Sequence, residues 1–252
     1  MTSVSRIEWT EQTWNPTIGC TKVSPGCAHC YAEIMAKRLK AMGTKGYENG
    51  FQLTLLPYRL IEPLNRKTPT VYFVNSMSDV FHEDVPFDYI DQIFEVVEKS
   101  PQHTFQILTK RAARMAEYFA GKKAPDNAWL GVSVEDREFG LPRIEELRSV
   151  DAKVRLLSSE PLLESLGEID LTGIHWVIVG GESGPHARPM KQEWVEEILS
   201  QCQTSDVPFF FKQWGAWGQD GRKRAKKQNG RQLNGRIWDQ MPLAAQGKGY
   251  QK

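Results

Sequence analysis

Short apolar segments alternate with helical segments along most of this chain of 252 residues, and this alternation limits its possible folds more than any other feature. The apolar segments are rich in β-branched and aromatic residues, as strands buried on both faces of a parallel sheet are. A weaker strand candidate lies near 6–10. The stronger candidates cover residues 70–75, 104–108, 129–134, 153–157, 174–180 and 207–212.

Helical patterns lie between these strands, at 28–42, 58–65, 87–99, 111–120, 141–150 and 192–201. Repeated βα units predict a parallel sheet with right-handed crossovers. We therefore expect an α/β fold, namely a partial (β/α) TIM-like barrel with a largely parallel sheet and about six or seven βα units. An open doubly wound sheet is the alternative, and in both folds ligands bind at the carboxyl ends of the strands.

Composition indicates a soluble globular protein, with 40% hydrophobic and 25% charged residues. No apolar run is long enough to span a membrane, and the few cysteines favour a reducing cytoplasm. The expected organisation is a barrel domain over 1–217 and a basic, Gly/Gln-rich extension over 218–252 that forms a loop or a mobile appendage. Within the extension, residues 221–236 include seven basic side chains and no acidic one, although the net charge of the chain is only +1.

Three cysteines lie close together, with the spacing Cys20-x6-Cys27-x2-Cys30, and the only other cysteine is Cys202. Three soft thiolates suit a metal or an iron–sulfur cluster, and they are one short of a closed four-thiolate site. Structural sites usually fill all four positions. An open fourth position therefore favours a site that performs chemistry.

Polar and ionisable residues follow nearly every predicted strand, as expected for an active site on a (β/α) scaffold. Helix N-caps would explain any one of them, but they explain the repetition poorly. The residues that we select as candidates are Ser76, Ser78, Asp79, Lys110, Ser133, Glu135, Glu160, Gly180, Gly181, Glu182, Lys212 and Gln213.

Residues 27–32 (CAHCYA) resemble the second half of the cluster motif of the radical S-adenosylmethionine (radical-SAM) superfamily, including the aromatic residue after the last cysteine. The usual motif is C-x3-C-x2-C, so the longer first gap departs from it at Cys20. Ser78-Asp79, Thr109-Lys110 and Val132-Ser133 resemble, in the same order, segments of the spore photoproduct lyase branch. Most of the chain up to Gly218 resembles a phage- and prophage-associated three-cysteine family of unknown function, through segments such as WNPTIGCTKVSPGCAHCYAE, SMSDVFH, SSEPLL and FKQWG.

The resemblance implies a [4Fe–4S] cluster held by Cys20, Cys27 and Cys30, with S-adenosylmethionine on the fourth iron. By analogy, Ser76, Ser78 and Asp79 would bind the methionine end, and Ser133 and Glu135 the ribose. Gly180 and Gly181 would allow close approach of the adenosyl group, and Glu182 would hold a polar group of cofactor or substrate. Lys110, Glu160, Lys212 and Gln213 would contact the substrate.

A nucleic acid is the first substrate expected, since basic residues beside Trp214 and Trp217 suit phosphates and bases. These basic residues are Arg222, Lys223, Arg224, Lys226 and Lys227. A peptide or small metabolite is an alternative substrate. The expected partners are an external electron donor and a protein encoded nearby. We expect no association with a membrane.

Two readings without radical chemistry remain open. Structural zinc could be held by the three cysteines with His29 or Cys202. The chain could also be a nucleic-acid-binding module in which the barrel is only a scaffold.

Overall fold

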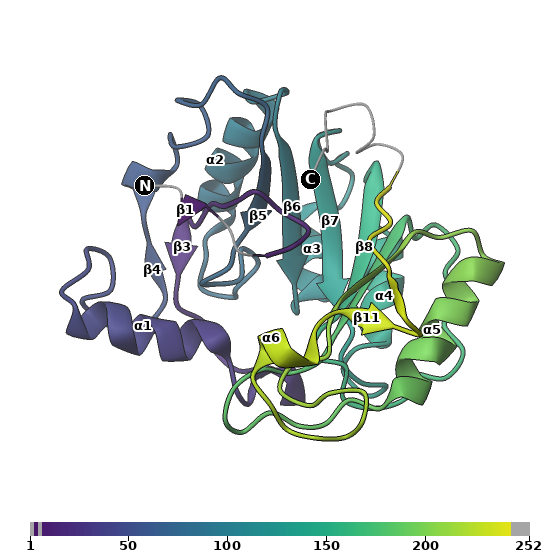
Figure 1. Ribbon diagram of the computed structural model, residues 1–252. Coiled ribbons are helices and arrows are strands. Elements are labelled where there is room, and N and C mark those ends of the chain that lie inside the picture. Colours follow the sequence, from purple (N-terminus) through teal and green to yellow (C-terminus); the bar gives the residue numbers. More distant parts are fainter. Residues whose placement is uncertain (1–2, 5–6, 243–252) are drawn as a thin grey trace. The chain divides into compact units, whose positions relative to one another are not determined.

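The computed structural model describes residues 3–4 and 7–242. Among them, the main sheet has the strand order β1-β2-β5-β6-β7-β8-β9-β10 (Figure 1). The strands are β1 (Ser3–Val4), β2 (Gln12–Thr13), β5 (Val71–Val74), β6 (Thr104–Thr109), β7 (Ala128–Ser133), β8 (Val154–Ser159), β9 (Trp176–Gly180) and β10 (Phe209–Gln213). Strand β1 is antiparallel to β2, whereas β2–β5, β5–β6, β8–β9 and β9–β10 pair in parallel. The predicted fold class, a partial (β/α) TIM-like barrel with a largely parallel sheet, is confirmed.

Burial explains why the strands could be found from sequence. Every residue of β7 and of β9 is buried, as a strand covered on both faces requires. Each of the six stronger candidates overlaps one strand from β5 to β10. The candidate near 6–10 is wrong for residues 7–10, which form a turn. There the Thr10 hydroxyl donates to the nearby backbone carbonyl of Gln12 at 3.3 Å and to that of Val71 at 3.0 Å, side-chain contacts that replace sheet pairing.

The chain divides into two compact units, which we describe separately. Unit 1 comprises Met1–Val23, Cys30–Gly131 and Ser149–Lys153. It holds the helices α1 (Tyr31–Ala41), α2 (Phe87–Glu98) and α3 (Ala112–Tyr118), and the small antiparallel sheet of β3 (Thr17–Ile18) and β4 (Thr54–Leu55). One of its apolar clusters is formed by Ile18, Ala32, Ala36, Tyr47, Leu56 and Met77.

One predicted helix of unit 1 is wrong. Residues 58–65 do not form an α-helix; instead the 3₁₀ helix η2 (Pro57–Arg59) is followed by turns. Pro63 explains the interruption, because proline has no backbone N–H to donate and its ring clashes with the preceding helical turn. The helix predicted over 28–42 begins only at Tyr31, and the 3₁₀ helix η1 (Pro25–Cys27) precedes it.

Unit 2 comprises Ser24–His29, Val132–Arg148 and Val154–Lys252. It holds the helices α4 (Pro142–Arg148), α5 (Gln192–Thr204) and α6 (Lys226–Asn229), and a hairpin of β11 (Gln232–Leu233) and β12 (Arg236–Ile237).

The segment after Gly218, expected to be a loop or mobile appendage, contains α6 and this hairpin. It also contacts the sheet of its own unit: Phe211 donates its N–H to the carbonyl of Trp238 at 2.8 Å. Residues 243–252 of the predicted extension lie outside the described residues, and the domain boundary at 217/218 stays a prediction. No helix in the described part of the chain is long and apolar enough to cross a membrane.

Candidate functional site

Cys20 lies in a part of unit 1 whose backbone is closely packed. The preceding Gly19 has φ 81°, and a Cβ there would lie 2.2 Å from the carbonyl oxygen of Gln52, so no side chain fits. Ser78 donates its hydroxyl to the carbonyl of Gly19 at 2.6 Å, and Gly19 donates its N–H to the carbonyl of Met77 at 2.9 Å. Ser78, predicted to bind the methionine end of a cofactor, therefore fixes the residue before Cys20.

Asp79 is buried at the carboxyl end of the first predicted strand and has all its acceptor positions used within unit 1. Its Oδ1 accepts from the Thr109 hydroxyl at 2.7 Å and the Phe81 N–H at 3.0 Å. Its Oδ2 accepts from the Lys110 N–H at 3.0 Å and from Nη1 of Arg111 at 3.2 Å. A carboxylate has about four acceptor positions, so this arrangement makes Asp79 an anchor for the 109–111 turn. A direct cofactor contact for Asp79 stays a prediction.

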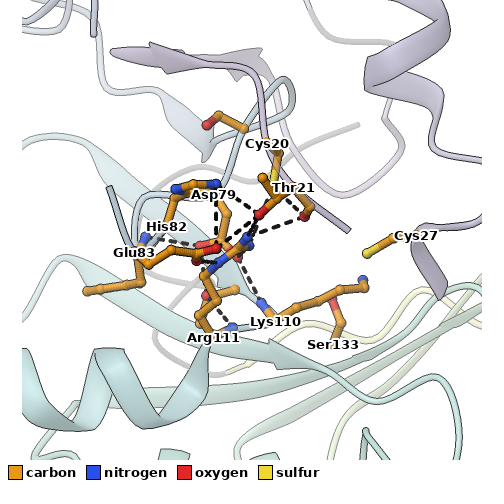
Figure 2. Close-up of polar contacts among 12 residues, drawn as sticks. Cys20, Thr21, Cys27, Asp79, His82, Glu83, Lys110, Arg111 and Ser133 are labelled. Atoms are coloured by element: carbon orange, nitrogen blue, oxygen red, sulfur yellow. Dashed lines mark hydrogen bonds and ion pairs between the residues drawn. The ribbon is translucent and has the colours of Figure 1, made fainter. Parts of the chain in front are cut away.

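Arg111 connects this anchor to Cys20, as Figure 2 shows. Its Nη1 lies 3.4 Å from the sulfur of Cys20, and its Nε donates to Glu83 Oε2 at 2.5 Å. Burial lowers the pKa of Arg111, but Glu83, Asp79 and Cys20 raise it by more than burial lowers it, so the pKa lies above its usual value. The Arg111 hydrogen bond lowers the pKa of Glu83 to about 2.

A buried histidine completes this network (Figure 2). Nδ1 of His82 accepts the backbone N–H of Asp84 at 3.1 Å, which assigns the proton of the neutral ring to Nε2. Nε2 then donates to the Thr21 hydroxyl at 3.0 Å, and that hydroxyl donates to Glu83 at 3.0 Å. Burial, and then the charge of Arg111, lower the pKa of His82 and favour this neutral form.

Sequence reasoning missed Thr21, His82 and Glu83 as parts of the site. Arg111, at the start of the predicted helix 111–120, was not among the candidates either. The placement of His82 at the end of the SMSDVFH segment (76–82), with Glu83 directly after it, was the one available signal.

The other two candidates of unit 1 have different surroundings. Ser76 exchanges hydrogen bonds with the side chain of Asn15, at 3.1 and 3.2 Å. Lys110 is half-buried, and its backbone N–H is the donor to Asp79.

In unit 2, Glu135 supports the segment that carries Cys27. The Ser24 hydroxyl donates to Glu135 Oε1, and Ser24 Oγ lies 3.9 Å from the sulfur of Cys27. Nη1 of Arg143 donates both to Glu135 Oε2 and to the carbonyl of Ser133, each at 2.7 Å. A Cβ on Gly26 would lie 2.9 Å from Glu135 Oε1, so the loop passes close over this carboxylate. Glu135 was predicted to bind a ribose; here both its oxygens accept hydrogen bonds from the protein.

A second, partly buried cluster of unit 2 joins the ends of β8 and β10. Nζ of Lys212 lies 2.7 and 2.8 Å from the two carboxylate oxygens of Glu160, and the amide of Gln213 donates to Glu160 at 3.1 Å. Neighbouring strand residues normally point to opposite faces. A register shift between Phe211 and Gln213 accompanies the approach of both side chains to one carboxylate.

The glycine turn after β9 holds its residues tightly. A Cβ on Gly181 would lie 2.0 Å from the carbonyl oxygen of Trp214, and one on Gly180 would lie 3.3 Å from Glu160. Glu182 is buried and pairs bidentately with Arg188, at 2.6 and 2.9 Å. Burial raises the pKa of Glu182, but the Arg188 hydrogen bonds outweigh it and leave the pKa lowered.

The basic segment is partly engaged within unit 2. Lys223 donates to the carbonyl of Pro185 and lies over the ring of Trp217, 5.6 Å from its centroid. Arg224 pairs with Asp220. Arg222, Lys226 and Lys227 are exposed. The predicted nucleic-acid role of the segment stays untested.

The cysteines can be judged as cluster ligands from their chemistry. Cys20, Cys27 and Cys30 are half-buried and none of them is in a disulfide bond. Among the described residues no group of three His, Cys, Asp or Glu side chains is arranged to hold a metal ion. Cys20 and Cys30 belong to unit 1 and Cys27 to unit 2. Cys202 is fully buried in α5, which raises the pKa of its thiol to about 12 and makes it a poor fourth ligand. The three-thiol donor set fits an iron–sulfur cluster.

Comparisons with known proteins give a family and distant structural neighbours. A family model described as "Protein of unknown function (DUF5131)" matches residues 4–242. No curated protein matches the chain.

Among solved structures, a spore photoproduct lyase complexed with dinucleoside spore photoproduct is similar at 11% identity and a TM-score of 0.48. A mutant of that lyase with bound AdoMet and the dinucleoside gives 12% identity and a TM-score of 0.47. Each match covers 80% of this chain and 63% of the lyase chain, so this chain spans less than two thirds of that length. The similarity concerns the fold alone. The predicted phage association is not addressed by any of these matches.

Proposed function

This chain belongs to the DUF5131 family of proteins of unknown function, and we propose that it is a radical-SAM enzyme. Cys20, Cys27 and Cys30 would hold a [4Fe–4S] cluster with S-adenosylmethionine at the fourth iron. When bound, this pair supplies a one-electron cleavage of the sulfonium C–S bond that yields a 5′-deoxyadenosyl radical. An external electron donor is part of the proposal.

One observation carries this proposal: three half-buried cysteines, none in a disulfide bond, lie within one short segment, and the fourth cysteine is buried elsewhere. A thiolate-only set that is one ligand short leaves room for a cofactor on the remaining iron. In the zinc alternative His29 or Cys202 would close the site. His29 lies between two of the ligand cysteines in the sequence, and the burial and raised pKa of Cys202 make it a poor ligand.

The surrounding residues would bind and orient rather than perform the difficult chemistry. Ser78 holds the backbone beside Cys20, and Asp79 holds the turn that carries Arg111. Glu135 with Ser24 holds the backbone beside Cys27. Ser76 and Ser133 remain candidates for direct contacts with the methionine end and the ribose. Gly180, Gly181 and Glu182 remain candidates for the adenosyl side.

We further propose a nucleic acid as the substrate, with Arg222, Lys226 and Lys227 contacting phosphates. Their exposure supports this, because phosphate contacts require accessible cations. The clustered Glu160, Lys212 and Gln213, together with Lys110, would contact the reacting part of the substrate. A peptide or small metabolite would use the same cluster without the basic segment. A partner protein encoded nearby remains part of the proposal.

The test is anaerobic reconstitution of the full chain with iron and sulfide, followed by dithionite reduction in the presence of S-adenosylmethionine. We expect about four irons per chain, a brown colour and formation of 5′-deoxyadenosine. Cys27→Ala and Cys30→Ala should abolish all three, whereas the matched control Cys202→Ala should retain them. Oxygen-free protein that carries stoichiometric zinc and no inorganic sulfide would contradict the proposal.

A further inference from the structure

Arg111 uses every donor of its guanidinium group within unit 1. Nη1 donates to the sulfur of Cys20 at 3.4 Å and to Asp79 at 3.2 Å, and Nε donates to Glu83 at 2.5 Å. Nη2 donates to the hydroxyl and carbonyl of Thr21, at 2.8 and 3.3 Å. A guanidinium group has five N–H donors, so its orientation is fully determined by these contacts.

We propose that Arg111 is a positioning residue for Cys20, and that it holds this sulfur in place and stabilises the reduced state of the cluster that Cys20 would ligate. The inference rests on the proposed function. It assigns a role to Arg111, which lies outside the cysteine motif. The cysteine that Arg111 contacts, Cys20, is the one at which the motif departs from the usual spacing.

The backbone of Arg111 is held as firmly as its side chain. Its N–H donates to the Thr109 hydroxyl at 2.9 Å, and that hydroxyl donates to Asp79 at 2.7 Å. Arg111 is also the residue that precedes helix α3. The turn, the helix start and the guanidinium group are therefore fixed by the same carboxylate, and the donor that reaches Cys20 has little freedom to move.

The loop on the other side of this contact is restrained as well. Thr21, next to Cys20, accepts hydrogen bonds from Arg111 and His82 and donates one to Glu83. The first gap of the motif is twice the usual length, so Cys20 depends less on its neighbours in sequence for its position. The contacts from Arg111 supply a restraint from a distant part of the chain.

The electrostatic effect follows from burial. The side chain of Arg111 is only 8% exposed, so its charge acts on the neighbouring sulfur with little screening. Hydrogen bonds to ligand sulfurs and nearby positive charge raise the reduction potential of an iron–sulfur cluster. Removal of Arg111 would also leave Asp79 and Glu83 without their cationic partner, which lowers the potential further.

The experiment compares reconstituted full-length variants by redox titration of the cluster, followed by its visible absorbance and by the EPR signal of the reduced form. Arg111→Met should lower the midpoint potential by about 59 mV, which corresponds to about a tenfold change in the equilibrium constant of a one-electron reduction. Arg111→Lys should restore part of this shift, because it keeps the charge without the forked contacts. Glu83→Gln should move the potential in the opposite direction, since it removes a negative charge beside Arg111.

The matched control is Arg114→Met in helix α3, three residues after Arg111, because Arg114 donates to the carbonyl of Val85 and lies over the ring of Phe87. It should leave the potential unchanged. If Arg111→Met fails to fold, the other two variants provide the test: Arg111→Lys should lower the midpoint potential and Glu83→Gln should raise it. A wild-type cluster with potentials unmoved in the Arg111 and Glu83 variants would overturn the inference and leave the proposed function standing. A wild-type chain that forms no cluster would overturn both.

Discussion

Arg143 donates one N–H to the buried carboxylate of Glu135 at 2.7 Å, and through that carboxylate it supports the loop that carries Cys27. Glu135 is fully buried and the side chain of Arg143 is 9% exposed. A pair this deeply buried has little solvent to compensate either charge if its partner is lost.

Arg143→Met should therefore destabilise the chain by about 3 kcal/mol, because it removes the cation that donates to the buried Glu135 carboxylate. The measurement is urea unfolding at neutral pH. Arg148→Met on the same helix is the matched control: its ion pairs are with the exposed carboxylates of Glu145 and Asp170, and its removal should cost at most about 1 kcal/mol. Equal losses in the two variants would contradict the structural role of the Glu135 pair.

Gly26 gives a more local test of the same loop. Gly26→Ala places a methyl group 2.9 Å from Glu135 Oε1, closer than a carbon and an oxygen normally approach, so the loop and the carboxylate must separate. We expect iron incorporation at Cys27 to fall about tenfold, with the unfolding midpoint changed much less. Iron and sulfide analysis after reconstitution provides the measurement. Ala28→Ser, in the same loop and exposed, should incorporate iron like the wild type.

The sequence predicted those parts of the molecule that follow from periodic burial. Strands β5 to β10 were found because both their faces are covered, and α5 was found because its apolar residues recur at helical spacing. The helix over 58–65 failed because proline chemistry outweighed its apolar pattern. The short sheet of β3 and β4 has too few residues to leave a recognisable pattern.

The candidate site was predictable in its location but not in its internal contacts. Strand ends gave Asp79 and Glu135 directly, since polar residues gather there in (β/α) folds. Nothing in the sequence shows that Asp79 is used by Arg111 and Thr109, or that Glu135 is used by Ser24 and Arg143. Three of these four contacts join residues at least 30 positions apart in the chain, and they exist only once the tertiary structure has formed.

His175 predicts how stability depends on pH. Its Nδ1 accepts the backbone N–H of Arg155 at 3.1 Å, and burial followed by the Arg155 charge lowers its pKa from 6.5. The folded state thus binds fewer protons than the unfolded state as the pH falls below about 6.5, so stability should decrease with acidification in that range.

Urea unfolding at pH 7.5 and pH 5.5 measures this effect. His175→Gln has no such titration, so its loss of stability between the two pH values should be smaller than that of the wild type. His186→Gln, which changes an exposed histidine, is the control and should behave like the wild type. A wild type and a His175→Gln variant with the same pH dependence would show that this ring does not titrate differently on folding.

The basic segment makes a prediction about salt. If Arg222 and Lys227 contact phosphates, replacing both with Ala should weaken binding to single-stranded nucleic acid and reduce the slope of log K against log salt by about 1.4, since each lost contact removes about 0.7. Fluorescence anisotropy with a labelled oligonucleotide, measured over a series of salt concentrations, gives both quantities.

The control is the double variant Lys37→Ala, Lys99→Ala, which changes the net charge equally. Its lysines lie on α1 and just after α2 in unit 1, and each is paired with a glutamate. That control should keep the wild-type slope, because a general change in net charge does not remove a specific phosphate contact. Equal slopes in all three proteins would exclude the segment as a phosphate-binding surface and leave a peptide or small metabolite as the substrate class.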